Sequence, residues 1–116
     1  AVVIAANAYS PLLSRFFEGR KLVDPFRGQI ITSKPLTRPL PVSYPHSFDH
    51  GYEYALRTPD NRLMIGGWRN HTPGGEVGTY DVQPTALVEQ GLIDFVREHY
   101  DLGETPEWEY SWAGIM

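Results

Sequence analysis

The stretch that decides the fold is residues 47–70, which read SFDHGYEYALRTPDNRLMIGGWRN. Large and small or polar side chains alternate over residues 52–57, and this period of two is typical of a half-buried strand. Residues 58–61, TPDN, combine a proline with two residues that tolerate left-handed backbone, so they predict a turn. Residues 62–65 predict a returning strand. The whole stretch therefore predicts a hairpin whose second strand ends at two glycines, where a bulge or a close backbone approach is possible.

The clearest helix is predicted over residues 84–100. Val88, Leu92 and Val96 recur at a helical spacing and form one apolar stripe, which must pack against another element. We expect that element to be the sheet. Gly91 lies on the same stripe and would allow a close approach of the helix.

Further extended segments complete the predicted sheet. Residues 24–33 predict a strand with Pro25 at its entrance, and residues 34–45, with four prolines, predict an extended connection. Residues 108–112 predict a final strand with Trp108, Tyr110 and Trp112 on one face and Glu107 and Glu109 on the outward face. The sequence therefore predicts an α+β fold, a largely antiparallel sheet with one long amphipathic helix packed on it.

The N-terminal segment has a different pattern. The apolar run from Val2 to Ala6 predicts a strand covered on both faces, as in the parallel sheet of an α/β domain. A short helix is expected next, with Ser10 as its capping acceptor, Pro11 at its first position and Gly19 at its end. Both ends of the chain are apolar, which suggests a piece of a larger protein. The unpaired edge at Val2–Ala6 could also make the piece a homodimer.

Composition excludes several classes of function. The 116 residues suffice for one domain with a core, and the formal net charge of −4 without a basic cluster disfavours nucleic acid. The first residues are too short an apolar run to span a bilayer, so no membrane partner is expected. There are no cysteines, which excludes disulfides and thiolate metal sites and is compatible with a cytoplasmic location.

Few motifs in the sequence indicate chemistry. His46, Asp49 and His50 are close enough in sequence to suggest a metal site, but a third ligand and an oriented second shell cannot be assigned, so solvent-facing roles are favoured and no metal is expected. There is no G-x-S-x-G elbow, phosphate-binding loop or G-x-G-x-x-G fingerprint, which disfavours autonomous nucleotide binding. The aromatic residues remain, and they are equally consistent with a small-molecule pocket and with core packing. They are Tyr52, Tyr54, Trp68, Trp108, Tyr110 and Trp112.

The order of four short segments shows a family resemblance. They are VVIAANAYSPLL at 2–13, PFRGQII at 25–31, RLMIGGWR at 62–69 and WAGIM at 112–116. In this order the chain resembles the second half of the glycine oxidase, sarcosine oxidase and D-amino-acid oxidase family of flavoproteins. It is most similar to the γ-glutamylputrescine-oxidase-like branch.

The resemblance implies a division of the chain and a cofactor, FAD. Residues 1–24 would be a remnant of the FAD-binding Rossmann domain, and residues 25–116 the substrate-binding domain. Tyr52 and Tyr54 would face a small amine or amino acid, with Met116 in the same site. The residues implied to lie near the cofactor are Ala6, Asn7, Ala8, Arg27, Gly28 and Gly114.

Two departures from the family pattern bear on the substrate and on the electron acceptor. Met116 stands where members that oxidise α-amino acids often have an arginine for the substrate carboxylate, which favours an amine or a carboxylate held elsewhere. Met64 stands where sarcosine-oxidase-like members have a lysine for oxygen activation, so a dehydrogenase is possible.

The family function implied for the full protein is hydride transfer from a substrate C–N bond to FAD. The chain lacks the dinucleotide fingerprint and the last strand and helix of the family, so alone it is expected to be inactive and without flavin. The alternative is a non-catalytic ligand-binding or interaction module of α+β fold.

Overall fold

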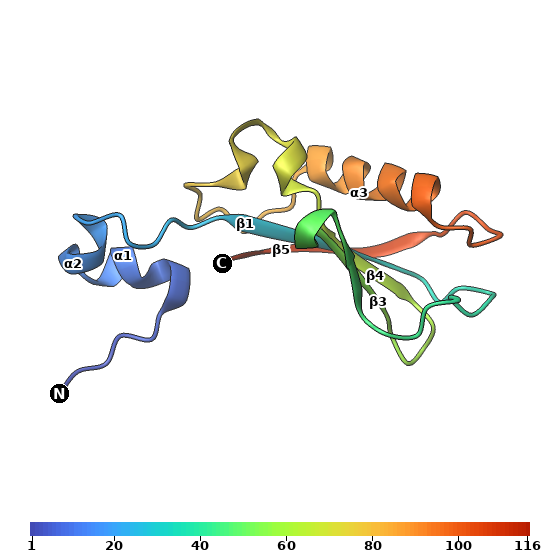
Figure 1. Ribbon diagram of the computed structural model, residues 1–116, viewed down its shortest axis with the longest axis horizontal. Coiled ribbons are helices and arrows are strands. Elements are labelled where there is room, and N and C mark those ends of the chain that lie inside the picture. Colours follow the sequence, from blue (N-terminus) through green and yellow to red (C-terminus); the bar gives the residue numbers. More distant parts are fainter.

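The computed structural model describes residues 1–116, which form a five-stranded sheet with a long helix across one face (Figure 1). All neighbouring strands are antiparallel, and their order in the sheet is β2-β3-β4-β1-β5. The α+β architecture expected from the sequence is therefore confirmed. The strands are β1 (Arg27–Ser33), β2 (His46–Phe48), β3 (Glu53–Arg57), β4 (Leu63–Gly67) and β5 (Trp108–Ile115), and the long helix is α3 (Ala86–His99).

The predicted hairpin is β3 and β4. Its turn is closed by a hydrogen bond from the Thr58 N–H to the Arg62 carbonyl at 3.0 Å, and Asn61 adopts a left-handed φ of 62°. At the other end of β4, Gly67 has a φ of 115°, and a Cβ there would overlap the Tyr52 carbonyl group. The expected close approach at the paired glycines is thus confirmed, and Gly67 can hardly be any other residue.

The core lies between the sheet and α3. Ile31 and Ile65 from adjacent strands meet Leu92 of the helix, and all three are fully buried. Each such side chain contributes about 1.5–3 kcal/mol through burial. Gly91 also faces the sheet, and its missing Cβ leaves the space that the Trp68 ring occupies. The predicted apolar stripe and its close approach are confirmed.

Strand β5 differs from its prediction. The pairing of β5 with β1 shifts between Thr32 and Ser33, so that Trp108 lies opposite Ser33 and Tyr110 lies opposite Thr32. Since Thr32 and Ser33 point to opposite faces, the expectation that Trp108 shares a face with Tyr110 and Trp112 is wrong. The bulge directs Trp108 towards α3, where it packs against the core.

The acidic residues near β5 form ion pairs. Lys34 contacts the Glu107 carboxylate at 2.6 Å, and Arg62 pairs with Glu109 and with Asp60. Both glutamates remain partly in solvent, so these pairs add little to stability.

The predicted N-terminal strand is absent. Residues 2–6 have no regular structure and lie mostly in solvent, because none of the five strands pairs with them and a strand needs a hydrogen-bonded neighbour.

The expected single short helix is also divided in two. After a 3₁₀ turn (Asn7–Tyr9), α1 (Ser10–Leu13) and α2 (Arg15–Glu18) are separated by Ser14, which is extended and caps α2 by accepting a hydrogen bond from the Phe16 N–H. Ser10 makes no capping bond. Leu12, Leu13 and Phe16 are exposed. In Figure 1 this part of the chain stands apart from the sheet and α3.

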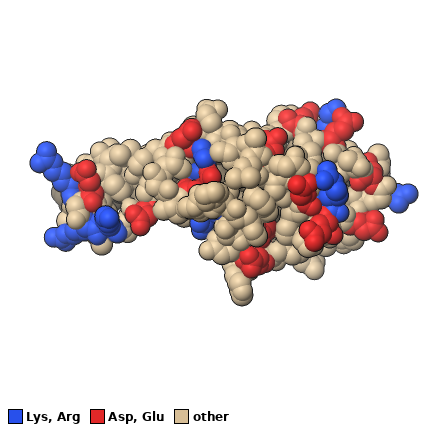
Figure 2. All heavy atoms as spheres, turned by 90° about the horizontal axis from the view of Figure 1, so that it is seen from above, with Lys and Arg blue, Asp and Glu red and all other residues tan.

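Charged side chains of both signs are spread over much of the surface. Figure 2 shows acidic and basic groups mixed around much of the surface, with several basic groups at one end of the molecule. Arg15, Arg20 and Lys21 lie in or next to α2 in the sequence. None of the helices combines the length and the apolar character that crossing a membrane requires.

Candidate functional site

The two faces of the sheet have different surroundings. One face is covered by α3, and the other has no helix over it (Figure 1). Strand register places Tyr54, Gly66, Ile30 and Trp112 in one row across this open face. Gly28 and Gly114 form the next row. Tyr52, Trp112 and Met116 are each about two-fifths or more exposed, so the open face is apolar and incompletely covered.

A cavity of about 340 Å³ opens at the end of this face where β4 ends and β1 begins. Its walls come from the entrance to β1, the 3₁₀ turn Asp49–Gly51, β3, the end of β4, the turn Arg69–His71 and the last residue. Four residues expected from the sequence to be in the site are therefore together: Gly28, Tyr52, Tyr54 and Met116. The lining residues are Phe26, Gly28, His50, Gly51, Tyr52, Tyr54, Gly67, Arg69 and Met116.

Met116 is positioned by the strand pairing. Its N–H donates to the Phe26 carbonyl at 2.9 Å, and its carbonyl accepts from the Phe26 N–H at 3.0 Å. The thioether consequently lies over Gly28, where a Cβ would overlap the methionine methyl group. Met116 is a flexible, uncharged wall of the cavity.

The two tyrosines form another wall. Tyr54 is half-buried, and its hydroxyl would lie 4.0 Å from a Cβ on Gly28, so the group is directed into the cavity. Burial raises the pKa of Tyr54 above its usual value, so its hydroxyl stays protonated at neutral pH. Neither this hydroxyl nor that of Tyr52 has a hydrogen-bond partner within the chain, which leaves both free to meet a ligand.

Arg69 is the charged residue of the cavity. Its guanidinium carbon lies 4.1 Å from the centre of the Phe26 ring and 5.2 Å from that of Tyr52. One amino group donates to the Gly75 carbonyl at 3.3 Å, and no carboxylate forms an ion pair with it. Arg69 ends the RLMIGGWR segment that carries the resemblance, but the sequence predicted no role for it, because its importance depends on what surrounds it in space.

Other predicted cofactor residues lie outside this cavity. Arg27 is only 11% exposed and forms ion pairs with Glu76 and Asp81. The turn with Ala6, Asn7 and Ala8 lies towards α1, and the Ala8 carbonyl accepts a hydrogen bond from the Tyr80 hydroxyl at 3.1 Å.

The pair Gly28 and Gly114 fits one side of a planar ring. No side chain stands on either residue, and a Cβ on Gly114 would have only the Trp112 ring near it, at 4.0 Å. A flat aromatic group can therefore approach the backbone at Gly114, whereas at Gly28 it would contact the Met116 side chain. The chain contains no phosphate-binding glycine motif, so this fit concerns only the ring portion of a dinucleotide.

Two of the three residues weighed as metal ligands, His46 and Asp49, have other partners. One ring nitrogen of His46 is hydrogen-bonded to the Tyr100 hydroxyl at 2.7 Å, and Asp49 accepts from the Asn70 amide at 3.0 Å. No group of three histidine, aspartate or glutamate side chains is arranged to hold a metal ion.

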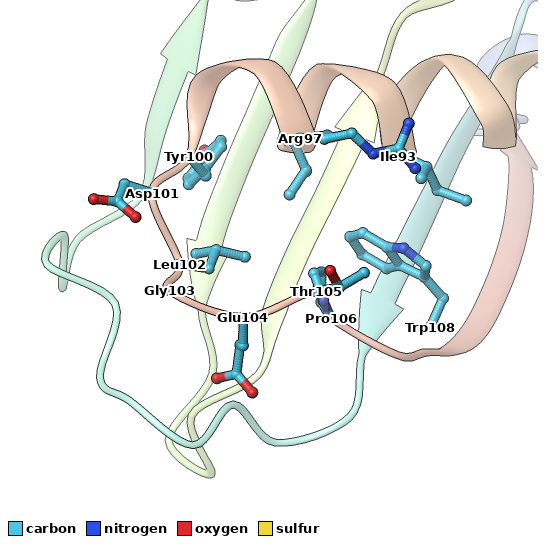
Figure 3. Close-up of a pocket in the computed structure, with 11 residues that line it drawn as sticks. Ile93, Arg97, Tyr100, Asp101, Leu102, Gly103, Glu104, Thr105, Pro106 and Trp108 are labelled. Atoms are coloured by element: carbon cyan, nitrogen blue, oxygen red, sulfur yellow. The ribbon is translucent and has the colours of Figure 1, made fainter.

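A second cavity, of about 220 Å³, lies beneath the C-terminal half of α3 (Figure 3). Trp108, Leu102 and Tyr100 line it together with Ile93, and this is the margin of the core. Burial raises the pKa of Tyr100 to about 12. Two of the charged groups at the rim have partners within the chain, Arg97 with Asp94 and Glu104 with Thr37. Packing explains this cavity, so the open-face cavity is the better candidate site.

Comparisons with known proteins identify the family and the fold. The family model described as DAO, FAD dependent oxidoreductase, matches residues 1–116. A sequence comparison with curated proteins gives no match.

Three solved structures share the fold. Glycine oxidase from Bacillus cereus ATCC 14579 is 19% identical over 98% of this chain with a TM-score of 0.72. Glycine oxidase from Geobacillus kaustophilus is 25% identical over 99% of this chain with a TM-score of 0.66. L-proline dehydrogenase from P. horikoshii is 22% identical over 96% of this chain with a TM-score of 0.64. The chain spans 29% of the length of each of these proteins.

Proposed function

Because the chain belongs to the DAO family of FAD-dependent oxidoreductases, we propose that it is the substrate-binding part of an enzyme that oxidises a C–N bond of a small amine or amino acid. Residues 25–116 form the substrate-binding domain in this proposal, and residues 1–24 belong to the FAD-binding domain. The γ-glutamylputrescine-oxidase-like branch is the part of the family to which we assign it.

The observation that supports this proposal most is the cavity on the open face of the sheet. Tyr52 and Tyr54 from the hairpin and Met116 after β5 line one space of about 340 Å³, a volume suited to a small molecule. Core packing, the alternative weighed for the aromatic residues, does not explain the position of Tyr52, because this side chain is 39% exposed. A non-catalytic module is not favoured, since the whole chain matches an oxidoreductase family.

The residues of this chain have distinct roles in the proposed reaction. Gly28 and Gly114 leave room for the flavin ring, and bound FAD supplies the acceptor for the hydride. Tyr54 stays neutral and, with Tyr52, orients the substrate and keeps water away from the reacting C–N bond. Met116 adapts its shape to the substrate because its side chain is unbranched.

The electron acceptor after the reaction is a separate part of the proposal. Met64 lies on the open face, in the row next to Tyr54, and places no charge there. We therefore propose slow reaction with O2 and a different natural acceptor. A reduced flavin that persists for minutes in air would support this, and immediate reoxidation by air would contradict it.

The experiment that tests the proposed function is anaerobic reduction of the flavin-containing protein. A panel of small primary and secondary amines and amino acids is added, and the visible absorbance of the oxidised flavin is followed. We expect at least one compound to bleach it. The experiment uses the whole enzyme of which this chain is proposed to be a part. A whole enzyme that binds no flavin, or whose flavin none of the panel reduces, would contradict the proposal.

A further inference from the structure

Arg69 has no internal counterion, although its side chain is well held. Its guanidinium carbon lies over the rings of Phe26 and Tyr52, 4.1 and 5.2 Å from their centres, and one amino group donates to the Gly75 carbonyl. Stacking of this kind fixes the plane of a guanidinium without using its N–H donors. Several donors of Arg69 therefore remain available in a fixed orientation.

Arg27 shows what a structural arginine looks like in the same part of the molecule. Its guanidinium contacts Glu76 at 2.5 Å and Asp81 at 3.4 Å, and it also donates to the Gln83 carbonyl at 2.9 Å. Arg27 is the first residue of β1 and Arg69 begins the turn after β4, yet only Arg27 is neutralised by carboxylates. Packing alone does not explain why Arg69 lacks a carboxylate.

The surroundings of Arg69 favour an anion. None of the nine residues that line the cavity is acidic, and the walls are chiefly aromatic, aliphatic or glycine. A positive charge in such surroundings is only weakly screened, so it attracts an anion more strongly than an exposed arginine does. The planar fork of a guanidinium matches a carboxylate with two parallel hydrogen bonds.

We infer that the substrate contains a carboxylate and that Arg69 binds it, so that the substrate is an amino acid and not a simple amine. This inference rests on the proposed function. It makes Arg69 a specificity-determining residue and gives a role to the loop after β4. Tyr52 and Phe26 are positioning residues, because they act by holding the guanidinium in place.

The decisive experiment compares pairs of compounds that differ only in a carboxylate, such as N-methylglycine with dimethylamine. Rates of anaerobic flavin reduction are measured for the wild-type protein, Arg69→Met and Arg69→Lys. We expect Arg69→Met to lower kcat/KM for the amino acid by about 10- to 100-fold, the loss typical of charged hydrogen bonds. The amine should be affected less than about twofold. Arg69→Lys should lie between, because lysine keeps the charge and loses the fork.

Arg20→Met is the matched control. Arg20 also stacks on an aromatic ring, 4.2 Å from the centre of Phe16, but it lies outside the cavity. Arg20→Met should leave the ratio of kcat/KM for the amino acid to kcat/KM for the amine unchanged. Equal losses of rate for both compounds in Arg69→Met would overturn the inference and would indicate a role in folding or towards the flavin.

A binding measurement makes the test independent of turnover. Propionate has no amino group to oxidise, and its binding to the oxidised protein is followed by calorimetry, with inorganic phosphate as a second anion. We expect propionate binding that weakens at least tenfold in Arg69→Met. Equal binding of propionate to both proteins, or binding of phosphate in its place, would contradict the inference. If no compound reduces the flavin, the proposed function fails, and propionate binding still decides the role of Arg69.

Discussion

The guanidinium carbon of Arg69 lies over the ring of Phe26, 4.1 Å from its centre, at the edge of the cavity on the open face of the sheet. Phe26 is fixed in turn by two backbone hydrogen bonds to Met116. The entrance to β1, the loop after β4 and the end of β5 thus meet at one place. The predictions below follow from this meeting of segments and from the fold that produces it.

Gly28→Ala should fill part of the cavity. A methyl group at this position overlaps the end of the Met116 side chain and approaches the Tyr54 hydroxyl. Because Met116 is flexible, we expect the melting temperature to change little while KM for the substrate rises about tenfold, which corresponds to about 1.4 kcal/mol of binding. Thermal melts and steady-state kinetics measure the two effects. An unchanged KM would show that the substrate lies elsewhere.

Gly114→Ala should separate cofactor binding from stability. The added methyl group meets no atom of this chain closer than the Trp112 ring, at 4.0 Å, so the fold should tolerate it. If the flavin ring lies over the row formed with Gly28, the methyl group should lower the fraction of purified protein that retains flavin. The ratio of visible to protein absorbance gives that fraction. Full retention of flavin in this variant would contradict the placement of the ring.

Gly67→Ala should destabilise the hairpin severely. The residue has a φ of 115°, and its Cβ would collide with the Tyr52 carbonyl group, so both backbone strain and overlap oppose the change. We expect a loss of more than about 3 kcal/mol in the free energy of unfolding. Gly74→Ala is the control, since Gly74 has a φ of 77° with open space around it. It should cost only about 1–2 kcal/mol. Urea denaturation measures the free energy of unfolding of both variants. Equal losses in the two would refute the role of the overlap with the Tyr52 carbonyl group.

Glu53 should make stability depend on pH. Its carboxylate is 1% exposed on the α3 side of the sheet, and burial raises its pKa above the ordinary value of 4.5. His71, 3.7 Å away, opposes this rise in the pKa, while Asp49 adds to it. Asp94, Glu98 and His99 of α3 line a further cavity together with Glu53. The folded state therefore binds the proton more tightly, and stability falls as the pH rises from about 4.5 through the raised pKa.

Glu53→Gln should remove this loss of stability with rising pH. The free energies of unfolding of the variant and the wild-type protein are compared by urea denaturation at several pH values. We expect the variant to gain relative to the wild type as the pH rises, because glutamine has no proton to lose. If the free energies of unfolding of the two proteins change with pH in parallel, ionisation of the Glu53 carboxylate does not lower the stability, and this would contradict the prediction.

Local patterns were sufficient to predict much of the fold. The alternation in the segment 52–57 predicted β3, and the stripe through Leu92 predicted the buried face of α3, because both periodicities are fixed by backbone geometry. The bulge in β5 could not be predicted, since it depends on how β5 pairs with β1. The strand expected at 2–6 failed for a related reason, because an apolar run forms a strand only beside a partner.

The candidate site was predictable only in part. The hairpin tyrosines and Met116 were expected in it from resemblance, and the strand register and the cavity bring them together. Arg69 was missed because sequence alone does not show which arginine lacks a carboxylate. Arg27 and Arg69 look alike in the sequence, and only their surroundings, with Glu76 beside one and Phe26 beside the other, distinguish them.

The most direct test of the account is a crystal structure of the flavin-containing protein with propionate bound. We predict that the flavin ring lies over the open face at Gly28 and Gly114, and that the propionate carboxylate is bound by Arg69 between the ring and the tyrosines. A flavin on the α3 side of the sheet, or propionate bound away from Tyr52, Tyr54 and Arg69, would contradict it.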